Sequence, residues 1–293
     1  MPRSDFRAYL ALVSVCVVWG TTYLAIRIAL ESIPPFWLVS SRFLISGSLM
    51  CAFLWWRGDR FPRGRDAWMT ALYGVLILGI GNGALTLSET YIASGLAGLF
   101  ITLSPFWMIS IEAMLPGGEK IHVPTLLGMM VGLSGTVFLV SRGLTNNAFG
   151  SNVVRGFFVL QLGMVCWSFG SIAQRRLKLR CSPIAAGALH QMAAGIAFLP
   201  VAFLTPSEPI RWTAHGVGAL VYLVVFGSIL GYTSYAYALS HLPVAVVSIH
   251  NYVNCAVGVF LGWLVYREPF GMREVAAMLV IFGGVGIVKK TSS

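Results

Sequence analysis

The sequence contains two related halves, and each half carries five long apolar segments. A shift of about 148 residues aligns Trp19 in the first segment with Trp167 in the sixth, together with the apolar residues around them. A chain that crosses a bilayer five times in its first half must begin its second half on the opposite side. The duplication therefore predicts two five-helix repeats of inverted orientation, at residues 8–141 and 153–288.

The composition indicates a protein whose solvent is lipid. Hydrophobic residues make up 57% of the chain, charged residues 10%, and the mean hydropathy is +0.80, which is too apolar for a water-soluble domain to cover its surface with polar groups. We therefore expect an all-α integral membrane protein with ten transmembrane helices, each long enough to cross about 30 Å of hydrocarbon. The predicted spans are 8–28, 36–56, 68–87, 92–112, 123–140, 153–172, 183–204, 217–236, 244–266 and 272–288.

The basic residues are concentrated on one side of the predicted membrane. With the N-terminus inside, thirteen of the 20 Lys and Arg residues lie on its side: Arg3, Arg7, Arg57, Arg60, Arg63, Arg65, Lys120, Arg175, Arg176, Lys178, Arg180, Lys289 and Lys290. Because cytoplasmic loops are enriched in these residues, both termini are predicted to be cytoplasmic. The net charge of +10 then suits anionic lipid headgroups, and no nucleic-acid partner is expected.

Three tryptophans are predicted to lie away from the membrane interfaces. Trp19 and Trp167 fall near the middle of their spans, and Trp107 lies inside the fourth span. An indole N–H at that depth needs a partner within the protein. These rings either line a substrate cavity, as the midplane sites of repeat transporters suggest, or pack in the core, and the sequence favours neither reading. Tyr23 and Tyr91 are further candidates for the same cavity wall.

The fourth and ninth spans contain residues that disturb a regular helix. Pro105 lies well inside the fourth span, where proline removes a backbone donor and bends or breaks the helix. The repeat-related stretch of the ninth span has His250, Asn251 and Asn254 instead. Irregular backbone at membrane depth is tolerated only against protein or a water-filled cavity. We therefore expect these two spans to form walls of a cavity.

Other polar side chains at membrane depth are candidate functional residues, because they are costly to keep there. Arg42 and His190 are aligned by the repeat, and they serve either in gating or as structural groups that snorkel or hold helices together. Glu89, near the end of the third span, is a candidate partner for Arg42. The predicted polar substrate-binding residues are Asn82, Glu89, Gln161, His250, Asn251 and Asn254.

Some functional classes are disfavoured by what the sequence lacks. No acidic residue is predicted at mid-depth, whereas a proton-coupled carrier of lipophilic cations would use a buried carboxylate there. Transport of a neutral or zwitterionic metabolite is therefore the first hypothesis, and efflux of drugs or amphipathic cations is the second. No catalytic motif is present, and the five cysteines have no metal-ligand or paired spacing. We expect neither an enzyme nor a cofactor, metal or disulfide.

The two halves share a pattern that resembles a known family. Each has a tryptophan followed by a small residue in its first helix, an Arg or His in its second and a Glu before its last helix: Trp19-Gly20 and Trp167-Ser168, Arg42 and His190, Glu119 and Glu268. This pattern resembles the EamA branch of the drug/metabolite transporter superfamily, over nearly the whole chain. Within it, the sequence is most similar to the YddG-type exporters of aromatic and other amino acids.

The resemblance implies an inner-membrane carrier that exports amino acids or related small metabolites by alternating access. Its partners would be a small-molecule substrate, bound in a cavity among spans 1, 3, 4, 6, 8 and 9, and the lipid bilayer, with a monomer as the simplest oligomeric state. The first span has no carboxylate before Glu31, unlike the small four-helix relatives, which argues against proton antiport by that route. A non-transporting membrane binding or scaffold protein remains the alternative from another class.

Overall fold

The protein is a bundle of membrane-length helices. The computed structural model describes residues 3–92, 94–140, 150–177, 182–266 and 271–291. Seven of its helical spans are long and apolar enough to cross a membrane, and three shorter apolar helices, Val123–Phe138, Val244–Gly258 and Val275–Val288, bring the number to ten. The predicted fold class, an all-α membrane protein of ten spans, is confirmed.

Spans one to five form the first repeat. The first span is α1 (Arg3–Leu30) and the second is α2 (Pro35–Trp56). The third is built from α3 (Gly64–Gly74), η1 (Val75–Gly81) and α4 (Asn82–Ser88), the fourth from α5 (Ser94–Ile101) and α6 (Ser104–Met114), and the fifth is α7 (Val123–Val140).

Spans six to ten form the second repeat in the same order. They are α8 (Ser151–Arg176), α9 (Pro183–Leu204), the run of α10 (Ala214–Tyr222), η3 (Leu223–Tyr232) and α11 (Thr233–His241), the pair α12 (Val244–Ser248) and α13 (His250–Tyr266), and α14 (Met272–Thr291). Most of the predicted seam between the repeats lies outside the described residues, as does Glu268.

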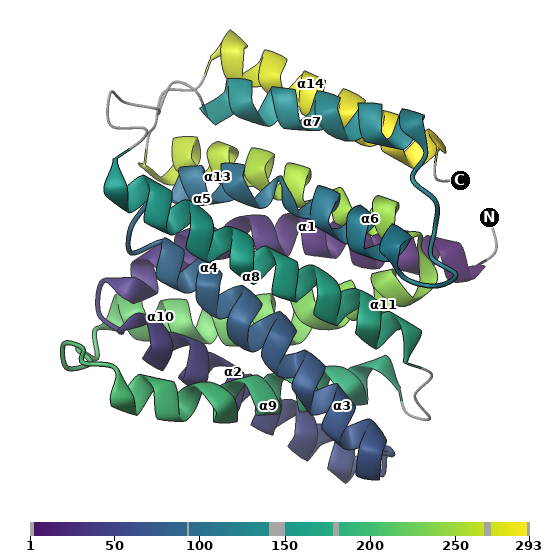
Figure 1. Cartoon of the computed structure of the whole chain (residues 1–293). Coiled ribbons are helices and arrows are strands. Elements are labelled where there is room, and N and C mark those ends of the chain that lie inside the picture. The colour runs from purple at the N-terminus through teal and green to yellow at the C-terminus, as the bar shows by residue number, and fades with distance from the viewer. Residues whose placement is uncertain (1–2, 93, 141–149, 178–181, 267–270, 292–293) are drawn as a thin grey trace.

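The two repeats have opposite orientations. In Figure 1, α1 begins on the side where α14 ends, whereas α8 begins on the other side. We call the side where α1 begins and α14 ends the terminus face, and the opposite side the distal face. Because each repeat crosses the bundle five times, corresponding helices of the two repeats run in opposite directions, as the duplication predicted.

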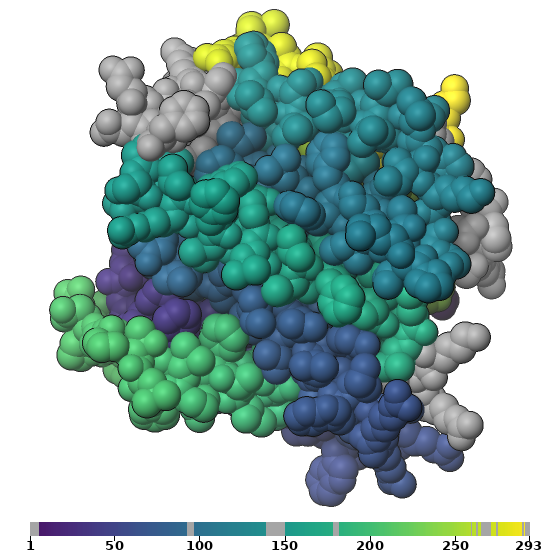
Figure 2. All heavy atoms as spheres, viewed as in Figure 1, coloured from purple at the N-terminus to yellow at the C-terminus, as the bar shows by residue number. Residues whose placement is uncertain are grey.

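The repeats interlock through pairs that take one helix from each. α2 packs on α9, and α7 packs on α14, and these pairs form opposite edges of the molecule (Figure 1). Between them, α8 of the second repeat contacts η1, α4 and α6 of the first. The space-filling view in Figure 2 shows α8 between these segments, so both repeats contribute to the same face.

α1 has an exposed apolar face that is suited to contact with lipid. Phe6, Leu10, Val13 and Val17 follow one another at intervals of three or four residues, and each is between 52% and 61% exposed. This spacing places them on one face of a helix. An exposed apolar stripe of this length would be unfavourable in water but is solvated by acyl chains.

Glycines at repeat-related positions allow α2 and α9 to approach closely. A Cβ atom on Gly47 would lie 2.6 Å from the backbone nitrogen of Met192, and one on Gly195 would lie 2.6 Å from that of Leu44. Ser40 also donates a hydrogen bond across this contact to the Gly195 carbonyl, at 2.9 Å. Close backbone contact of this kind supplies the van der Waals packing that holds helices together in lipid.

The fourth and ninth spans are interrupted, as the sequence predicted. The fourth divides between α5 and α6, with Pro105 in the first turn of α6, where a missing N–H leaves no helical bond unmade. The ninth divides at Ile249. There the His250 ring nitrogen Nδ1 lies 2.7 Å from the Val247 carbonyl, so a side chain satisfies backbone at the break.

The third and eighth spans each contain a π-helical segment, which the sequence did not predict. η1 and η3 occupy corresponding places in the two repeats. A π-helical turn changes the register of the side chains that follow it and is common at functional sites. Gly81, at the end of η1, packs against Trp167, and Gly227, within η3, packs against Arg42.

Substitution of the two contact glycines tests this packing. We expect Gly47→Ala and Gly195→Ala each to destabilise the protein by about 1–3 kcal/mol, because the new methyl group would overlap backbone that cannot move aside. The measurement is the thermal unfolding midpoint in detergent. Gly218→Ala is the matched control, since nothing lies within 4 Å of a Cβ there. Equal midpoints for all three variants would contradict the proposed contact.

Candidate functional site

A central cavity lies between the two repeats. In this conformation its free volume is about 50 Å³, which is below the roughly 300–1,000 Å³ of typical small-molecule sites. Both repeats contribute to its wall. The lining residues are Trp19, Thr22, Tyr23, Arg42, Gly81, Asn82, Leu85, Ile101, Ser104, Met164, Trp167, His250, Asn251 and Asn254. Seven of the predicted substrate-binding residues are therefore brought together here, and Arg42, predicted to serve in gating or structure, lies among them.

The other predicted binding residues lie elsewhere in the described structure. Trp107 donates from its indole to Gln161 Oε1 at 2.9 Å, and Gln161 donates to the Phe100 carbonyl at 3.0 Å. This chain of bonds ties the fourth span to α8. Tyr91 is 38% exposed, and neither it nor Glu89 belongs to the described lining of the cavity.

Trp19 is held by backbone of the opposite repeat. Its indole N–H donates to the carbonyl of Gly227 in η3 at 2.9 Å, so the polar group of this mid-span ring is satisfied inside the protein. A Cβ on Gly231 would overlap the Trp19 ring. The two glycines, four residues apart, therefore let the indole lie directly against η3.

Four rings form a continuous layer beside the central cavity, which we call the aromatic layer: Trp19, Trp167, Tyr235 and His250. The centroids of Trp19 lie 5.4 Å from Trp167, 5.1 Å from Tyr235 and 5.3 Å from His250. Trp167 donates to the Tyr235 hydroxyl at 3.2 Å, and that hydroxyl donates to Ser171 at 3.0 Å. Edge-to-face and tilted contacts at these distances are favourable, so the layer is well packed.

The aromatic layer separates the central cavity from the terminus face. α1 runs away from the terminus face and α8 runs toward it (Figure 1). Tyr23 therefore lies on the distal side of Trp19, and Met164 on the distal side of Trp167. Both Tyr23 and Met164 line the cavity, which places the cavity on the distal side of the layer.

A second pocket lies on the terminus side of the layer. Its wall includes Ser171, Gln174, His190, Tyr232 and Tyr235. The ring of His190 bonds through Nδ1 to the Tyr232 hydroxyl at 2.7 Å and through Nε2 to Gln174 Oε1 at 3.1 Å. The histidine that the repeat aligns with Arg42 thus ties α9 to α8 and η3 in a different pocket.

Arg42 is a buried cation in the wall of the central cavity. It is 4% exposed; its Nε donates to Ser228 Oγ at 2.7 Å and one terminal nitrogen donates to Asn82 Oδ1 at 3.1 Å. The suggested pairing with Glu89 is not formed. Arg42 is directed to η3 and α4 instead, and both carboxylate oxygens of Glu89 are buried without a hydrogen-bond partner among the described residues.

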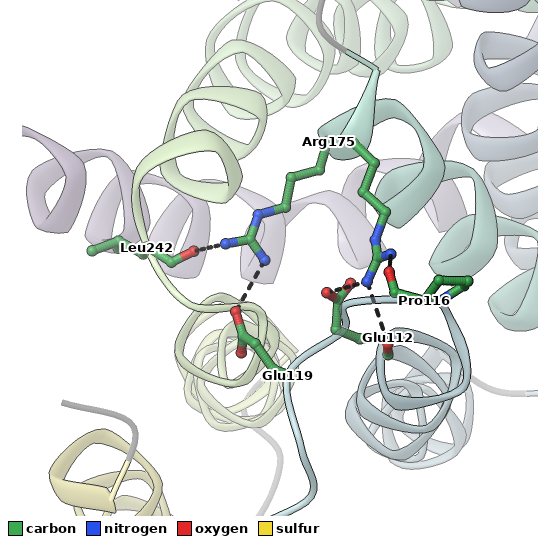
Figure 3. A network of polar contacts seen from close by, with 6 residues as sticks. Glu112, Pro116, Glu119, Arg175 and Leu242 are labelled. Carbon is green, nitrogen blue, oxygen red and sulfur yellow. Dashed lines mark hydrogen bonds and ion pairs between the residues drawn. The ribbon is translucent and has the colours of Figure 1, made fainter.

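Two arginines at the end of α8 bind the terminus face of the first repeat (Figure 3). Arg176 forms an ion pair with Glu112 at 2.7 Å and donates to the Pro116 carbonyl at 2.7 Å. Arg175 forms an ion pair with Glu119 at 3.3 Å. We call these two ion pairs the clasp, since they join the second repeat to α6 and the loop that follows it.

The sequence did not single out several residues that complete the site. Tyr235 is the main omission, although the shift of 146 residues that aligns Ser88 with Ser234 places it opposite Glu89. An acidic residue in one repeat is thus aligned with an aromatic residue in the other, and this difference could have marked the position. Ser228 and the pairing of the clasp had no such signal, because serines and loop charges are common throughout the chain.

Comparison with known proteins agrees with the architecture. The model of the EamA-like transporter family matches twice, at residues 6–141 and 154–289. An uncharacterized inner membrane transporter of Escherichia coli, YedA, is 32% identical over 95% of this chain and 89% of its own length. A chloroplastic WAT1-related protein of Arabidopsis thaliana is 23% identical over 98% of this chain and 70% of its own. A solved crystal structure of 23% identity superposes with a TM-score of 0.81, covering 97% of both chains.

The clasp predicts unequal roles for its two arginines. We expect Arg176→Gln to destabilise the protein by about 1–3 kcal/mol, because it leaves the buried Glu112 carboxylate without its partner. Arg175→Gln should cost under about 1 kcal/mol, since Glu119 is half exposed and water replaces the lost pair. Thermal unfolding measures both, and a Glu112→Gln/Arg176→Gln double variant should recover part of the loss. A larger effect from Arg175→Gln would contradict the assignment.

Proposed function

Because the chain belongs to the EamA-like transporter family, we propose that it exports amino acids with aromatic or neutral side chains, or related small metabolites, by alternating access. The chain is a membrane transporter by its family. The substrate class, the direction and the inner membrane as its location are parts of the proposal, with both termini in the cytoplasm.

The observation that supports the proposal best is a cavity between inverted repeats that is separated from one face. The aromatic layer lies between the cavity and the terminus face, and the clasp joins the repeats beyond it. Inverted repeats provide two related arrangements, one facing each side of the membrane, around a site near the midplane. With the termini in the cytoplasm, the conformation described here is closed toward the cytoplasm.

Opening toward the terminus face requires a limited set of contacts to break. The ring of Trp19, in the first repeat, must separate from the rings of Trp167 and Tyr235, in the second. The ion pairs of Arg175 and Arg176 must also release. Each contact is worth about 0.5–3 kcal/mol, so binding of a substrate can shift the balance between the two states.

The cavity wall favours a substrate with an apolar side chain and a polar head. Leu85, Ile101 and Met164 provide apolar surface, beside the faces of the two tryptophans. Asn251 donates from its amide nitrogen to the Ser248 carbonyl at 3.2 Å, which leaves its amide oxygen as a hydrogen-bond acceptor. Among the described lining residues none is acidic, which disfavours amphipathic-cation efflux, the second candidate.

Counterflow in reconstituted vesicles tests transport. We expect vesicles preloaded with unlabelled phenylalanine or leucine to accumulate the labelled amino acid, and Trp19→Ala to reduce the initial rate at least tenfold, because the ring lines the cavity and seals its inner side. Trp212→Ala is the control, since this tryptophan is 67% exposed in the loop before α10. Saturable accumulation excludes a scaffold role, and chemically altered substrate would instead indicate an enzyme. If no amino acid accumulates in the vesicles, the proposed substrate class is wrong.

The barrier role of the aromatic layer can be tested by thiol labelling. In a variant whose native cysteines are replaced and Ser104 is changed to Cys, a small membrane-impermeant thiol reagent is added at the terminus face. We expect Trp167→Ala to raise the rate of modification, because it removes a ring that separates the cavity from the second pocket. Trp212→Ala should leave the rate unchanged. An unchanged rate for Trp167→Ala would mean that the barrier lies elsewhere.

A further inference from the structure

We propose that Arg42 is the receptor for an anionic group of the substrate, a carboxylate, so that this cavity selects apolar carboxylic acids, amino acids among them. The inference deepens the proposed function and rests on it. It concerns a residue that the sequence suggested only for gating or structure and that the geometry places in the cavity wall.

The first argument is the missing counter-charge. Arg42 is 4% exposed and lies in the middle part of the bundle, where a charge is costly unless it is paired. In the described part of the chain, its side-chain partners are the hydroxyl of Ser228, the amide oxygen of Asn82 and the ring of Phe43, whose centroid lies 5.0 Å from Cζ. All three are neutral. The guanidinium is thus oriented by hydrogen bonds but not neutralised, and an anionic ligand would supply the missing charge.

The second argument is the orientation of the guanidinium. It has five N–H donors in a fixed plane, and the two bonds to Ser228 and Asn82 use one on Nε and one on a terminal nitrogen. The other terminal nitrogen is directed against Gly227, where a Cβ would come within 2.7 Å of it. Two side chains and a glycine therefore fix the plane before any ligand binds, and pre-orientation of this kind favours carboxylate binding.

The third argument is the composition of the rest of the wall. None of the described lining residues carries a carboxylate that would compete for the cation. Leu85, Ile101 and Met164 provide apolar surface in the same cavity. A ligand that matches this wall has one carboxylate and an apolar group of a few carbon atoms or a ring.

The repeat provides an internal comparison. The position aligned with Arg42 in the second half is His190, whose two ring nitrogens are both bonded to neutral groups, Tyr232 and Gln174. His190 lines the second pocket and not the central cavity. Of the two aligned positions, the one that lines the cavity therefore carries the arginine, which a purely architectural role repeated in both halves does not explain.

The competing explanation is that Arg42 only ties α2 to η3 and α4. The variant Asn82→Asp distinguishes this structural role from the receptor role, because it places a carboxylate of nearly the same shape at the 3.1 Å contact. A structural tie would be kept or strengthened by this internal ion pair. A substrate receptor would be occupied by it, so carboxylate binding should fall while the unfolding midpoint stays the same or rises.

The first measurement is binding of four related probes to the purified full-length protein by isothermal titration calorimetry at pH 7. They are L-phenylalanine, 3-phenylpropionate, L-phenylalaninamide and phenethylamine; the first two carry a carboxylate and the last two do not. We expect the two carboxylates to bind at least tenfold more tightly than the amide and the amine. Equal binding of all four would overturn the inference and leave amino acid transport intact.

The second measurement compares variants with the same probes. We expect Arg42→Gln and Asn82→Asp each to weaken 3-phenylpropionate about thirtyfold or more, as for loss of one partner of a buried charge pair, without weakening phenethylamine. Arg42→Lys should keep part of the affinity, because the charge remains. Ser46→Ala is the matched control on the same helix, since among the described residues this buried hydroxyl bonds to the Phe43 carbonyl of α2 alone.

The outcomes separate this inference from the proposed function. If 3-phenylpropionate binds in an Arg42-dependent way but no amino acid does, the amino acid cargo is wrong and the receptor role stands. If phenylalanine binds and Asn82→Asp has no effect on its affinity, the receptor role is wrong and the cargo stands. Binding of none of the four probes to the wild-type protein overturns both.

Discussion

Hydrocarbon offers no hydrogen-bond partners, so a polar group at the centre of this bundle is costly unless it is satisfied within the protein. Gly227 shows how the structure meets this constraint. Its carbonyl accepts the indole N–H of Trp19, and its missing side chain makes room for the guanidinium of Arg42. The next residue, Ser228, accepts from Arg42. One turn of the π-helical segment thus holds the first two helices of the opposite repeat, and the cavity wall depends on that contact.

The two repeats use the same device with different results. Gly81 packs against Trp167, with a Cβ coming within 3.0 Å of the ring, as Gly227 packs against Trp19 and Arg42. The indole of Trp167, however, donates to the Tyr235 hydroxyl and not to backbone. These differences gather the aromatic rings on one side of the cavity. A symmetric pair of repeats would place equal layers on both sides, whereas here the described layer separates the cavity from the terminus face.

Closure toward the terminus face is divided between apolar and charged contacts. The aromatic layer excludes water by packing, and the clasp joins the repeats nearer the surface through Arg176 and the buried Glu112. Neither is strong by itself, since an aromatic pair contributes about 0.5–1.5 kcal/mol and a partly exposed ion pair about 1 kcal/mol or less. A carrier needs this balance, because two states must lie within a few kcal/mol for a ligand to interconvert them. The family of the chain and the geometry of its cavity are consistent with that requirement.

The sequence by itself determined the ten spans, the inversion of the repeats and the interruptions at Pro105 and His250, because apolar length, duplication and local helix breaking are properties of neighbouring residues. It also identified half of the residues of the cavity wall as binding candidates, since polar and aromatic groups at membrane depth are few. Only the tertiary structure decided the partners of Arg42, the place of Tyr235 in the aromatic layer and the two π-helical segments. The bonds from Arg42 to Ser228 and from Trp19 to Gly227 join residues 186 and 208 positions apart. Such pairings depend on how whole helices pack, and no local pattern in the chain specifies them.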